Sequence, residues 1–466
     1  MEGVYAQEAL GEALVTAGWP LSLADDARRP NVLSTPREFV EALCTSAHVD
    51  TLFVLPGGVS LLEQEEALPR ELREAVQQQP TVRRLLDSLP DEMLRRLRGR
   101  VYLCGGGEEE ELKEGSDGER LVSLLDKRDA LRQRCAEAGG GGGGDDSGEE
   151  DGCGEEGGGG SSGSGGGGGG SEPRAYLGEV RWGQKYRHPV GGSWVKTLCA
   201  VDVKDYVGTG RSDALPYYDR YDEGVFVGGR FSGSPLHVDQ IGWSNVGKNF
   251  SGRKLLAVWP HGEATAELFR QHCYRLFTPP LQPAEEAALA AACKVALLTP
   301  GDVVLFSGAN AHMALSVSDS LSLTAYESFV NFHPRSVAAF LESGTERQYR
   351  ECRARARMVM EVKEEVVEAI LDLKADLDNG RVSDPLLLAH APPALQALQR
   401  DAFIAGRLKE AARLADAAGE HGGENDGGAP EQQQGRPRKA ARLHDASPLG
   451  QSAQPADPRG ERGDRE

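Results

Sequence analysis

Three residues of this chain have the types and spacing of a metal centre. His237 and Asp239 are separated by a single residue, and His312 ends the stretch over residues 301–312. Two imidazoles and one carboxylate are the protein ligands of non-haem Fe(II) facial triads, which leave metal positions open for a cosubstrate and dioxygen. The three residues therefore predict an oxygenase in which His237, Asp239 and His312 are both catalytic and metal-binding.

A β-strand would place the first two of these residues on one face. Residues i and i+2 of a strand point to the same side, so His237 and Asp239 would both face a barrel interior if residues 236–240 are extended. A His-x-Asp sequence is common by chance. The alternative interpretation of this pair alone is a histidine and an aspartate that share no role.

The segment that follows the second histidine alternates polar and apolar residues on both sides of a turn at Ser318, Asp319 and Ser320. Folding this segment as a hairpin places His312 and Thr324 opposite each other, with their Cβ atoms about 5 Å apart on one face. Thr324 would then lie beside the metal. The alternative is a surface hairpin with a serine-rich outer face and an incidental histidine.

A lysine stands at the start of an apolar strand segment. Lys254 precedes the run over residues 255–260. A strand lysine that points inward is costly unless it meets a negative charge, and a dicarboxylate cosubstrate would supply that charge. If Lys254 faces outward instead, it is a solvated edge residue.

The region around these residues has the pattern of a mainly β fold. Short apolar or alternating runs are punctuated by Gly, Pro, Ser and Asp, which is typical of a barrel or a jelly roll. The runs cover residues 195–203, 224–228, 255–260, 295–298, 303–306 and 321–326. An Ala- and Glu-rich stretch over residues 283–294 predicts a helix inserted among the strands.

The flanking segments differ from this β region in composition. Apolar residues recur at helical spacing in residues 1–136, which are expected to be a mostly helical region of unknown role. Residues 137–172 are almost entirely Gly, Ser, Asp and Glu and predict a disordered linker. Helical spacing returns in residues 341–418, where Asn379 and Gly380 are expected to cap the end of a first helix and a further helix follows. Residues 419–466 form a polar tail that is expected to be disordered.

Composition argues against several classes of protein. The 466 residues carry a formal net charge of -20, which disfavours whole-molecule attraction to nucleic acid or to an anionic membrane. No apolar run has the length of a membrane helix, and the eight cysteines contain no CxxC pair. An intracellular protein is expected, in the nucleus or the cytoplasm. The basic cluster over residues 436–442 favours the nucleus, and the alternative for that cluster is a solvated tail.

Residues 195–334 resemble JmjC-domain oxygenases, which use Fe(II) and 2-oxoglutarate. The resemblance is strongest to the protein-hydroxylase branch, in which the first ligand strand reads "SGT, two residues, H-x-D" and is followed by "G-x-K-x-W and P". The corresponding residues here are Ser232, Gly233, Ser234 in place of the threonine, His237, Asp239, Gly252 and Lys254, and Trp259 and Pro260 follow close behind. The spacing from His237 to Lys254 and that from His312 to Thr324 need no gap against this pattern.

The resemblance implies a fold and a set of cofactors. The implied fold is a mainly β catalytic core over residues 173–340, a double-stranded β-helix or jelly roll of the cupin-like JmjC type, between a helical N-terminal region and C-terminal helices. The implied metal is Fe(II), held by the His-Asp-His group, with 2-oxoglutarate as cosubstrate and O2 as oxidant.

The resemblance also assigns the residues that bind the cosubstrate. Lys254 and Thr324 match the pair that holds the far carboxylate of 2-oxoglutarate by charge-assisted bonding. Ser234 stands where a threonine hydroxyl assists them. Tyr217 and its neighbour Tyr218 both match a cosubstrate-binding tyrosine on an earlier strand.

Two positions depart from the family pattern. Gly247 stands where relatives often carry an asparagine that lines the cosubstrate pocket, and Tyr326 stands where they carry another asparagine. The segment between Asp219 and Phe226 is also much shorter than in relatives.

The implied function is hydroxylation of a protein side chain by an Fe(II)- and 2-oxoglutarate-dependent dioxygenase. The alternatives are a JmjC histone N-methyl-lysine demethylase, a non-catalytic metal-binding cupin-like module, and an RNA hydroxylase, which would need a basic cleft. Histones and other nuclear proteins are candidate substrates, whereas membranes and nucleic acid are not expected as partners. The C-terminal helices could form a homodimer, as in related hydroxylases, or pack as terminal helices.

Overall fold

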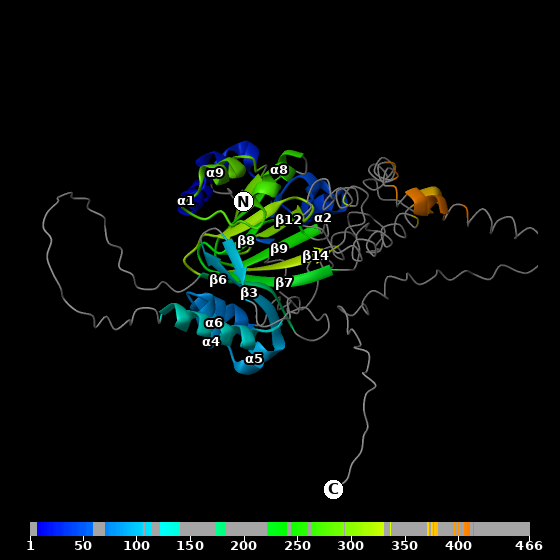
Figure 1. Cartoon of the computed structure of the whole chain (residues 1–466). Coiled ribbons are helices and arrows are strands. Elements are labelled where there is room, and N and C mark those ends of the chain that lie inside the picture. Colours follow the sequence, from blue (N-terminus) through cyan, green and yellow to red (C-terminus); the bar gives the residue numbers. More distant parts are fainter. Residues whose placement is uncertain are drawn as a thin grey trace, which may run out of the picture. The chain divides into compact units, whose positions relative to one another are not determined.

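A computed structural model gives the fold of the chain (Figure 1). It describes residues 7–58, 70–105, 108–112, 122–139, 174–182, 221–239, 244–259, 263–292, 294–329 and 336, with isolated positions and short runs between 371 and 413. Most of the predicted linker, most of the C-terminal helical region and all of the tail lie outside these residues. Within the C-terminal region, Gly380 has a φ of 63° and donates its N–H to the Leu377 carbonyl over 3.1 Å, which confirms the predicted C-cap.

The described strands form two sheets. The larger one has ten strands, nine of which run in the order β1 (Asn31–Val32), β2 (Phe53–Leu55), β12 (Val303–Ser307), β9 (Ser244–Ser251), β14 (Ser322–Phe329), β7 (Tyr221–Gly228), β6 (Arg174–Trp182), β3 (Leu97–Gly105) and β4 (Glu108–Glu111), while β5 (Val122–Ser123) pairs with β3. The smaller sheet runs β11 (Lys294–Leu298), β10 (Lys254–Val258), β13 (His312–Ser316) and β8 (Gly233–His237). All strand pairs are antiparallel except β1 with β2, so a mainly β core is confirmed.

From β7 onward the chain passes back and forth between the two sheets, except that the consecutive strands β10 and β11 both lie in the small one. Strands β7, β9, β12 and β14 belong to the large sheet, and β8, β10, β11 and β13 to the small one. The inner faces of the two sheets pack against each other through Leu256, Ala314, Phe306 and neighbouring apolar residues. The hydroxyls of Ser316 on β13 and Ser322 on β14 also meet across the interior at 2.6 Å. Side chains on these inner faces therefore share one interior between the sheets.

The predicted hairpin between His312 and Thr324 is wrong. His312 on β13 pairs with His237 and Val258 in the small sheet, whereas Thr324 on β14 pairs with Phe226 and Asn249 in the large sheet. The turn over residues 318–320 thus carries the chain from one sheet to the other. Polar and apolar alternation fixes which residues face inward, but it does not specify the partner strand.

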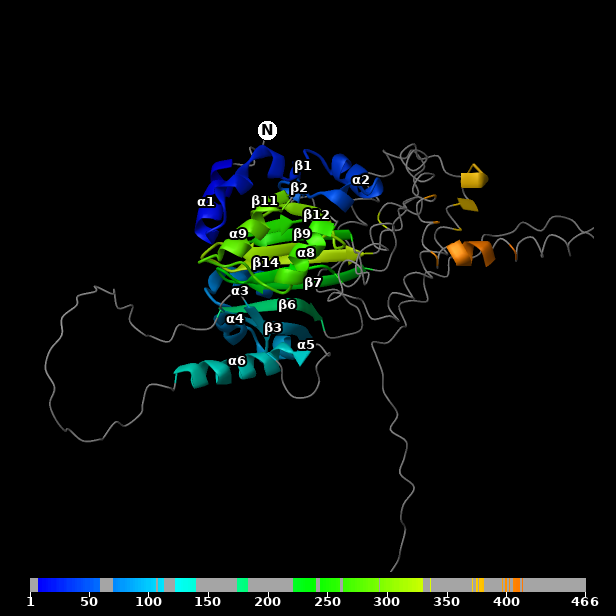
Figure 2. The same ribbon diagram turned by 45° about the horizontal axis from the view of Figure 1, so that its top comes forward.

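Helices cover the outer face of the small sheet. α1 (Gln7–Ala17), α8 (Glu263–His272) and α9 (Pro283–Ala290) supply buried side chains such as Leu14, Phe269 and Leu289, which cluster with Leu255 of β10 and Leu315 of β13. α9 begins at the proline predicted to open the inserted helix, and Gln282 and Glu285 form a capping box before it. Figure 2 shows α1 and α9 near β11.

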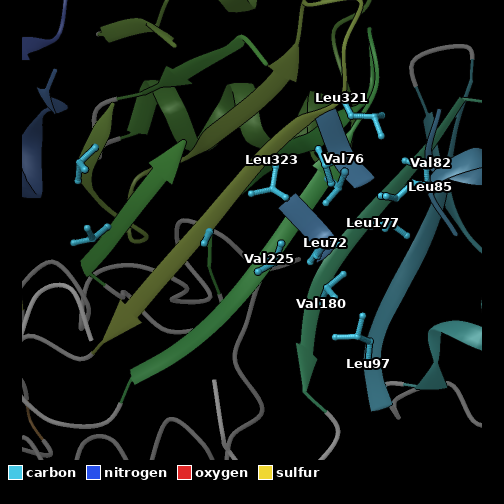
Figure 3. Packing of buried hydrophobic residues seen from close by; sticks show 14 of the residues in the cluster. Leu72, Val76, Val82, Leu85, Leu97, Leu177, Val180, Val225, Leu321 and Leu323 are labelled. Atoms are coloured by element: carbon cyan, nitrogen blue, oxygen red, sulfur yellow. The ribbon is translucent and has the colours of Figure 1, made fainter. Parts of the chain in front are cut away.

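A second group of helices covers the outer face of the large sheet. These are α2 (Pro36–Cys44), α3 (Arg70–Gln78), α4 (Val82–Ser88), α5 (Asp91–Arg96) and α6 (Leu124–Gly139). Figure 3 shows Leu72, Val76, Val82 and Leu85 of this layer beside Leu97, Leu177, Val180, Val225, Leu321 and Leu323 of the strands and their ends. Each fully buried leucine or valine of this kind contributes about 1.5–3 kcal/mol relative to an exposed one.

The N-terminal region is more than a helical layer. The sequence predicts residues 1–136 to be mostly helical, and α1 to α6 lie there, but β1 to β5 lie there as well. β2 pairs with β12 and β3 pairs with β6, so this region extends the large sheet at both ends. β1, β2 and β5 are only two or three residues long and are too short for an alternating pattern to identify.

The outer face of the large sheet also holds a buried ion pair. Lys248 on β9 and Glu327 on β14 place Nζ and Oε2 3.3 Å apart, and neither side chain is exposed. Burial of both charges is tolerated only because each meets a partner.

Among the described helices, none is long and apolar enough to cross a membrane.

Candidate metal centre

Strand pairing brings the two predicted histidine ligands together. His237 is the last residue of β8 and His312 is the first residue of β13, and the two are direct partners in the antiparallel ladder. Their ring centroids lie 4.1 Å apart with an interplanar angle of 53°. The register shifts between His312 and Ala314, as at a β-bulge. The histidines are therefore neighbours at the end of the small sheet.

Asp239 joins the histidines from outside the strand. β8 ends at His237, two residues before Asp239, and Gln240 lies outside the described residues, so the strand covers only the first part of the predicted 236–240 segment. The Asp239 N–H instead donates to the carbonyl of Gly308 over 3.0 Å, which fixes the chain beyond β8 against the segment before His312. Asp239 Oδ1 lies 3.6 Å from Nε2 of His237 and 3.7 Å from Nε2 of His312.

Each histidine is oriented by a backbone carbonyl. Nδ1 of His237 lies 2.7 Å from the Pro235 carbonyl oxygen, and Nδ1 of His312 lies 2.9 Å from that of Asn310. A carbonyl only accepts hydrogen bonds, so Nδ1 is the donor in both rings, and Nε2 is the nitrogen of each ring that could bind a metal. Histidine ligands of metals are commonly held in this way through the second ring nitrogen.

The aspartate is held from its other oxygen. Asn245 on β9 donates from Nδ2 to Asp239 Oδ2 over 2.7 Å, so Oδ1 remains directed toward the histidines. Gly308 lies against the same carboxylate, because a Cβ atom built on it would come within 2.0 Å of Oδ2. A side chain at position 308 would displace the carboxylate, so glycine is required there.

The electrostatics of the centre suit a cation. Burial lowers the pKa of His312 well below its usual value, and the nearby His237 lowers it further, so the imidazole is neutral and able to bind a metal. Burial raises the pKa of Asp239, while His237 and the hydrogen bond from Asn245 act in the opposite direction. One ligand atom from each of His237, Asp239 and His312 lies within 4.8 Å of the others, so the group could hold a metal ion. Nitrogen and carboxylate donors of this kind fit a first-row transition metal.

Lys254 places a charge in the same interior. It is the first residue of β10 and lies on the strand face of Leu256 and Val258, which pack between the sheets. Its side chain is fully buried, and its Nζ has no hydrogen-bond partner among the described residues. Burial lowers the pKa of Lys254 to about 7. An unpartnered buried amine is costly, so this position indicates a site for an anionic ligand.

Two further predicted residues lie near this lysine. The Lys254 Nζ lies 5.8 Å above the centroid of the Tyr176 ring, and the Tyr176 hydroxyl is 3.0 Å from the Ser234 hydroxyl. Thr324 donates from Oγ1 to Asn249 Oδ1 over 3.0 Å, and Asn249 in turn donates to the Gly252 carbonyl, just before Lys254. The structure therefore connects Ser234 and Lys254 through Tyr176, and it joins Thr324 on β14 to Asn249, whose side chain bonds to the turn that leads into β10.

Some predicted residues are placed elsewhere or are not described. The predicted cosubstrate-binding tyrosine, Tyr217, and its neighbour Tyr218 lie outside the described residues. Gly247 and Tyr326, the two departures from the family pattern, are direct partners on β9 and β14.

Sequence reasoning missed three residues of this centre: Asn245, Gly308 and Tyr176. Asn245, Gly247 and Asn249 lie at alternate positions on the inner face of β9. A polar side chain on an inward face needs a partner, and this signal could have identified Asn245 from the sequence. Gly308 lies only four residues before His312, but a glycine in a loop has many ordinary explanations. Tyr176 is distant in sequence from the other site residues, and no local pattern relates it to them.

Comparisons with known proteins add little to this geometry. No family model matches the chain, and no curated protein does either. Among solved structures, an X-ray structure of E. coli ycfD is similar, with a TM-score of 0.24 and 14% sequence identity over 52% of this chain. The match spans 45% of that structure's chain, and a likeness this weak carries no argument about fold or function.

Proposed function

We propose that this chain is an Fe(II)- and 2-oxoglutarate-dependent dioxygenase that hydroxylates a protein side chain. The observation that carries the proposal is the combination of two features in one interior. A His-Asp-His donor set has its three ligand atoms gathered together, and the buried amine of Lys254 has no hydrogen-bond partner among the described residues. A metal alone would account for the first feature, whereas an anionic cosubstrate accounts for the second.

The strand order supports a double-stranded β-helix as the core of this enzyme. The large sheet contains the sequence of neighbours β12, β9, β14 and β7, and the small sheet contains β11, β10, β13 and β8. A chain that alternates between two facing antiparallel sheets in this way is typical of jelly-roll folds. In such folds the inward side chains surround a central site.

The metal would be held by Nε2 of His237, Nε2 of His312 and Oδ1 of Asp239. The hydrogen bonds to the Pro235 and Asn310 carbonyls fix the two rings. When bound, Fe(II) with 2-oxoglutarate and O2 supplies the oxidising chemistry that converts a C–H bond into C–OH. The protein contributes ligand geometry, and burial keeps the His312 imidazole neutral.

Lys254 would bind the far carboxylate of the cosubstrate. A protonated amine that meets a carboxylate forms a charge-assisted hydrogen bond, and the surrounding apolar side chains strengthen it by excluding water. The Tyr176 ring lies below this amine, and its hydroxyl is hydrogen-bonded to that of Ser234, so the pair could supply a further donor. Tyr176 thus becomes a candidate, beside Tyr217, for the cosubstrate-binding tyrosine, and Thr324 remains a candidate through its bond to Asn249.

Apolar side chains would limit water at the reacting atoms. Phe306 packs edge-on against the His312 ring with the centroids 4.9 Å apart, and it clusters with Leu256 and Val258. His237 and Asp239 are more open, with 27% and 18% of their side-chain surfaces exposed. A substrate side chain would therefore approach from the side of His237 and Asp239.

Anaerobic titration with Fe(II) followed by 2-oxoglutarate tests the proposal. The wild-type protein should develop the metal-to-ligand charge-transfer band of the chelate, and His237→Ala should lose it. Lys254→Met should bind the metal as before but require much more 2-oxoglutarate for the same band. Absence of the band in the wild type, or an undiminished band in His237→Ala, would refute the site.

The reaction class needs a separate assay. Succinate formation should rise when a true protein substrate is added, and histone peptides are the first set to try. Formaldehyde release together with succinate would identify a demethylase, whereas a mass increase of one oxygen on the peptide without formaldehyde would identify a hydroxylase. Metal and 2-oxoglutarate binding without succinate formation from any peptide would favour the non-catalytic module.

A further inference from the structure

Gly247 and Tyr326 form an interlocked pair on the inner face of the large sheet. They are direct partners on the neighbouring strands β9 and β14. A Cβ atom built on Gly247 would come within 2.6 Å of Tyr326 Cε1 and within 2.7 Å of Val304 Cγ1. The tyrosine ring therefore lies over the position that any larger residue at 247 would fill, so the glycine is what makes room for the ring.

Aromatic neighbours fix the direction of this tyrosine. Its ring makes edge contacts with Phe226, at a centroid distance of 5.5 Å and an angle of 84°, and with Phe306, at 6.2 Å and 89°. Phe306 in turn packs against the metal-binding His312. A ring held at right angles by two others has little rotational freedom, so its hydroxyl has a defined position.

Tyr326 is close enough to the metal centre for the charge of Asp239 to act on its phenol, and Phe306 contacts both Tyr326 and His312. Tyr326 is half-buried, whereas Thr324 on the same strand face is fully buried, so the tyrosine borders an open part of the interior. Burial and the negative charge of Asp239 both raise the pKa of Tyr326, which keeps the phenol protonated.

We infer that Tyr326 is a ligand-binding residue of the metal centre, whose hydroxyl donates a hydrogen bond to a carboxylate oxygen of the small acid bound there, in a position that exists because residue 247 is glycine. This inference rests on the proposed function, because the acid is the proposed cosubstrate. A neutral O–H that borders an open, cation-binding interior is suited to an anionic oxygen. Tyr326 would also narrow the space beside the metal and so favour small acids over larger ones.

The test separates ligand binding from metal binding. Co(II) titration, followed by the visible absorption of the bound ion, measures the metal site alone. Anaerobic Fe(II) with increasing 2-oxoglutarate measures the acid through the charge-transfer band. Tyr326→Phe removes only the hydroxyl and keeps the ring contacts. Tyr102→Phe is the matched control, since it removes the hydroxyl of another half-buried tyrosine. The Tyr102 ring contacts Tyr176, and Tyr176 in turn contacts Phe226.

The outcomes are distinct. Tyr326→Phe should bind Co(II) with the wild-type affinity and raise the Kd for 2-oxoglutarate about tenfold or more, as expected for loss of a hydrogen bond to a charged group. Tyr102→Phe should leave both constants unchanged. An unchanged 2-oxoglutarate Kd in Tyr326→Phe would overturn the inference and leave the proposed function intact. Loss of Co(II) binding in Tyr326→Phe would also overturn it, because the hydroxyl would then support the metal ligands.

A wild-type protein with no charge-transfer band would refute the proposed function and this inference together.

The packing of Tyr326 against Gly247 has its own test, independent of any ligand. Gly247→Ala should lower the Tm of the wild-type protein more than that of a Tyr326→Ala variant, since the smaller residue removes the closest contact. Equal losses in the two backgrounds would show that the tyrosine does not depend on the glycine.

Discussion

Asn245 donates a hydrogen bond from Nδ2 to Oδ2 of Asp239 over 2.7 Å, and so holds the carboxylate with its other oxygen toward the two histidines. Replacing Asn245 with alanine should therefore weaken metal binding while leaving all three ligands in place. Loss of such a supporting bond typically costs about 10–100-fold in metal affinity. Competitive Co(II) titration of the purified variant measures the change.

Asn249→Ala is the matched control for this variant. It lies on the same inward face of β9, but its side chain bonds to Thr324 and Gly252 instead of to a metal ligand. Its Co(II) affinity should stay close to that of the wild type. Equal losses of metal affinity in the two variants would mean that damage to β9, and not the bond to Asp239, weakens the site.

Gly308→Ala should abolish the metal centre. The new Cβ would come within 2.0 Å of Asp239 Oδ2, and neither the carboxylate nor the backbone bonded to it can move without loss of the ligand geometry. Gly229→Ala is the control, because the nearest atom to its added Cβ is 3.7 Å away, an ordinary contact distance. Circular dichroism should show both variants folded, and only Gly308→Ala should fail to bind Co(II). Normal binding there would place Asp239 outside the ligand set.

Lys254→Met should stabilise the ligand-free protein while removing 2-oxoglutarate binding. The lysine buries an amine that has no partner among the described residues, and methionine fills a similar volume without a charge. The gain in the free energy of unfolding at pH 6, measured by urea denaturation, should be about 5 kcal/mol, because a pKa lowered from 10.5 to about 7 corresponds to about 1.4 kcal/mol per unit. A loss of stability would show that the amine has a favourable contact in the free protein.

The stability gain from Lys254→Met should depend on pH in a defined way. Burial lowers the pKa of Lys254 to about 7 in the folded chain, from 10.5 in the unfolded one. Between these values the unfolded state binds a proton that the folded state lacks, so wild-type stability rises with pH across this window. The advantage of the variant should therefore be largest below pH 7 and vanish toward pH 10.5. A pH-independent difference would contradict the shift.

The same titration predicts how cosubstrate affinity varies with pH. An anionic carboxylate favours the protonated amine of Lys254, so the ligand binds with proton uptake above the pKa of about 7. The Kd for 2-oxoglutarate should then rise with pH by up to about tenfold per unit. Titrations of 2-oxoglutarate, followed by the charge-transfer band over roughly pH 6.5 to 8.5, check this, because that range spans the pKa of Lys254. A flat profile would mean that Lys254 stays protonated or does not contact the acid.

The buried ion pair of Lys248 and Glu327 should be cooperative. Glu327→Gln alone leaves the lysine charge buried without its partner and should cost about 3–5 kcal/mol of stability. The double variant Lys248→Met with Glu327→Leu should cost less than Glu327→Gln, because it removes both charges at once. Denaturation of Lys248→Met, Glu327→Leu and the double variant that combines them gives the coupling energy. Additive losses would show that the pair contributes no net interaction.

Several features of the fold and of the site could be predicted from the sequence because they depend on local pattern. Alternation and turn residues identified β7, β10, β11, β12 and β14 closely, and the spacing of His237, Asp239 and His312 identified a group that the structure brings within ligand distance. For Lys254 the sequence left two orientations open, inward toward an acidic ligand or outward into solvent. The structure buries the side chain, which is the inward orientation.

The remaining features depend on pairing between distant strands, which local pattern does not encode. The partner of β13 is β8 and not β14, so Thr324 lies in the other sheet from His312. Asn245, Gly308 and Tyr176 acquire their roles through tertiary contacts with Asp239 and Lys254. Short N-terminal strands such as β2 form because β12 offers an edge to pair with, and their own residues carry little strand signal.

The pairing of β2 with β12 and of β3 with β6 means that the two sides of the glycine-rich segment share one sheet. Asn310, two residues before His312, also donates from its side chain to the Val49 carbonyl over 2.7 Å. The segment before the glycine-rich stretch is thus part of the same folded core as the metal-binding residues. Strand pairing joins the two segments, in addition to the peptide chain itself. Two separately expressed fragments, divided within residues 140–173, should reassemble by strand complementation, whereas the second fragment alone would present two unpaired sheet edges and aggregate.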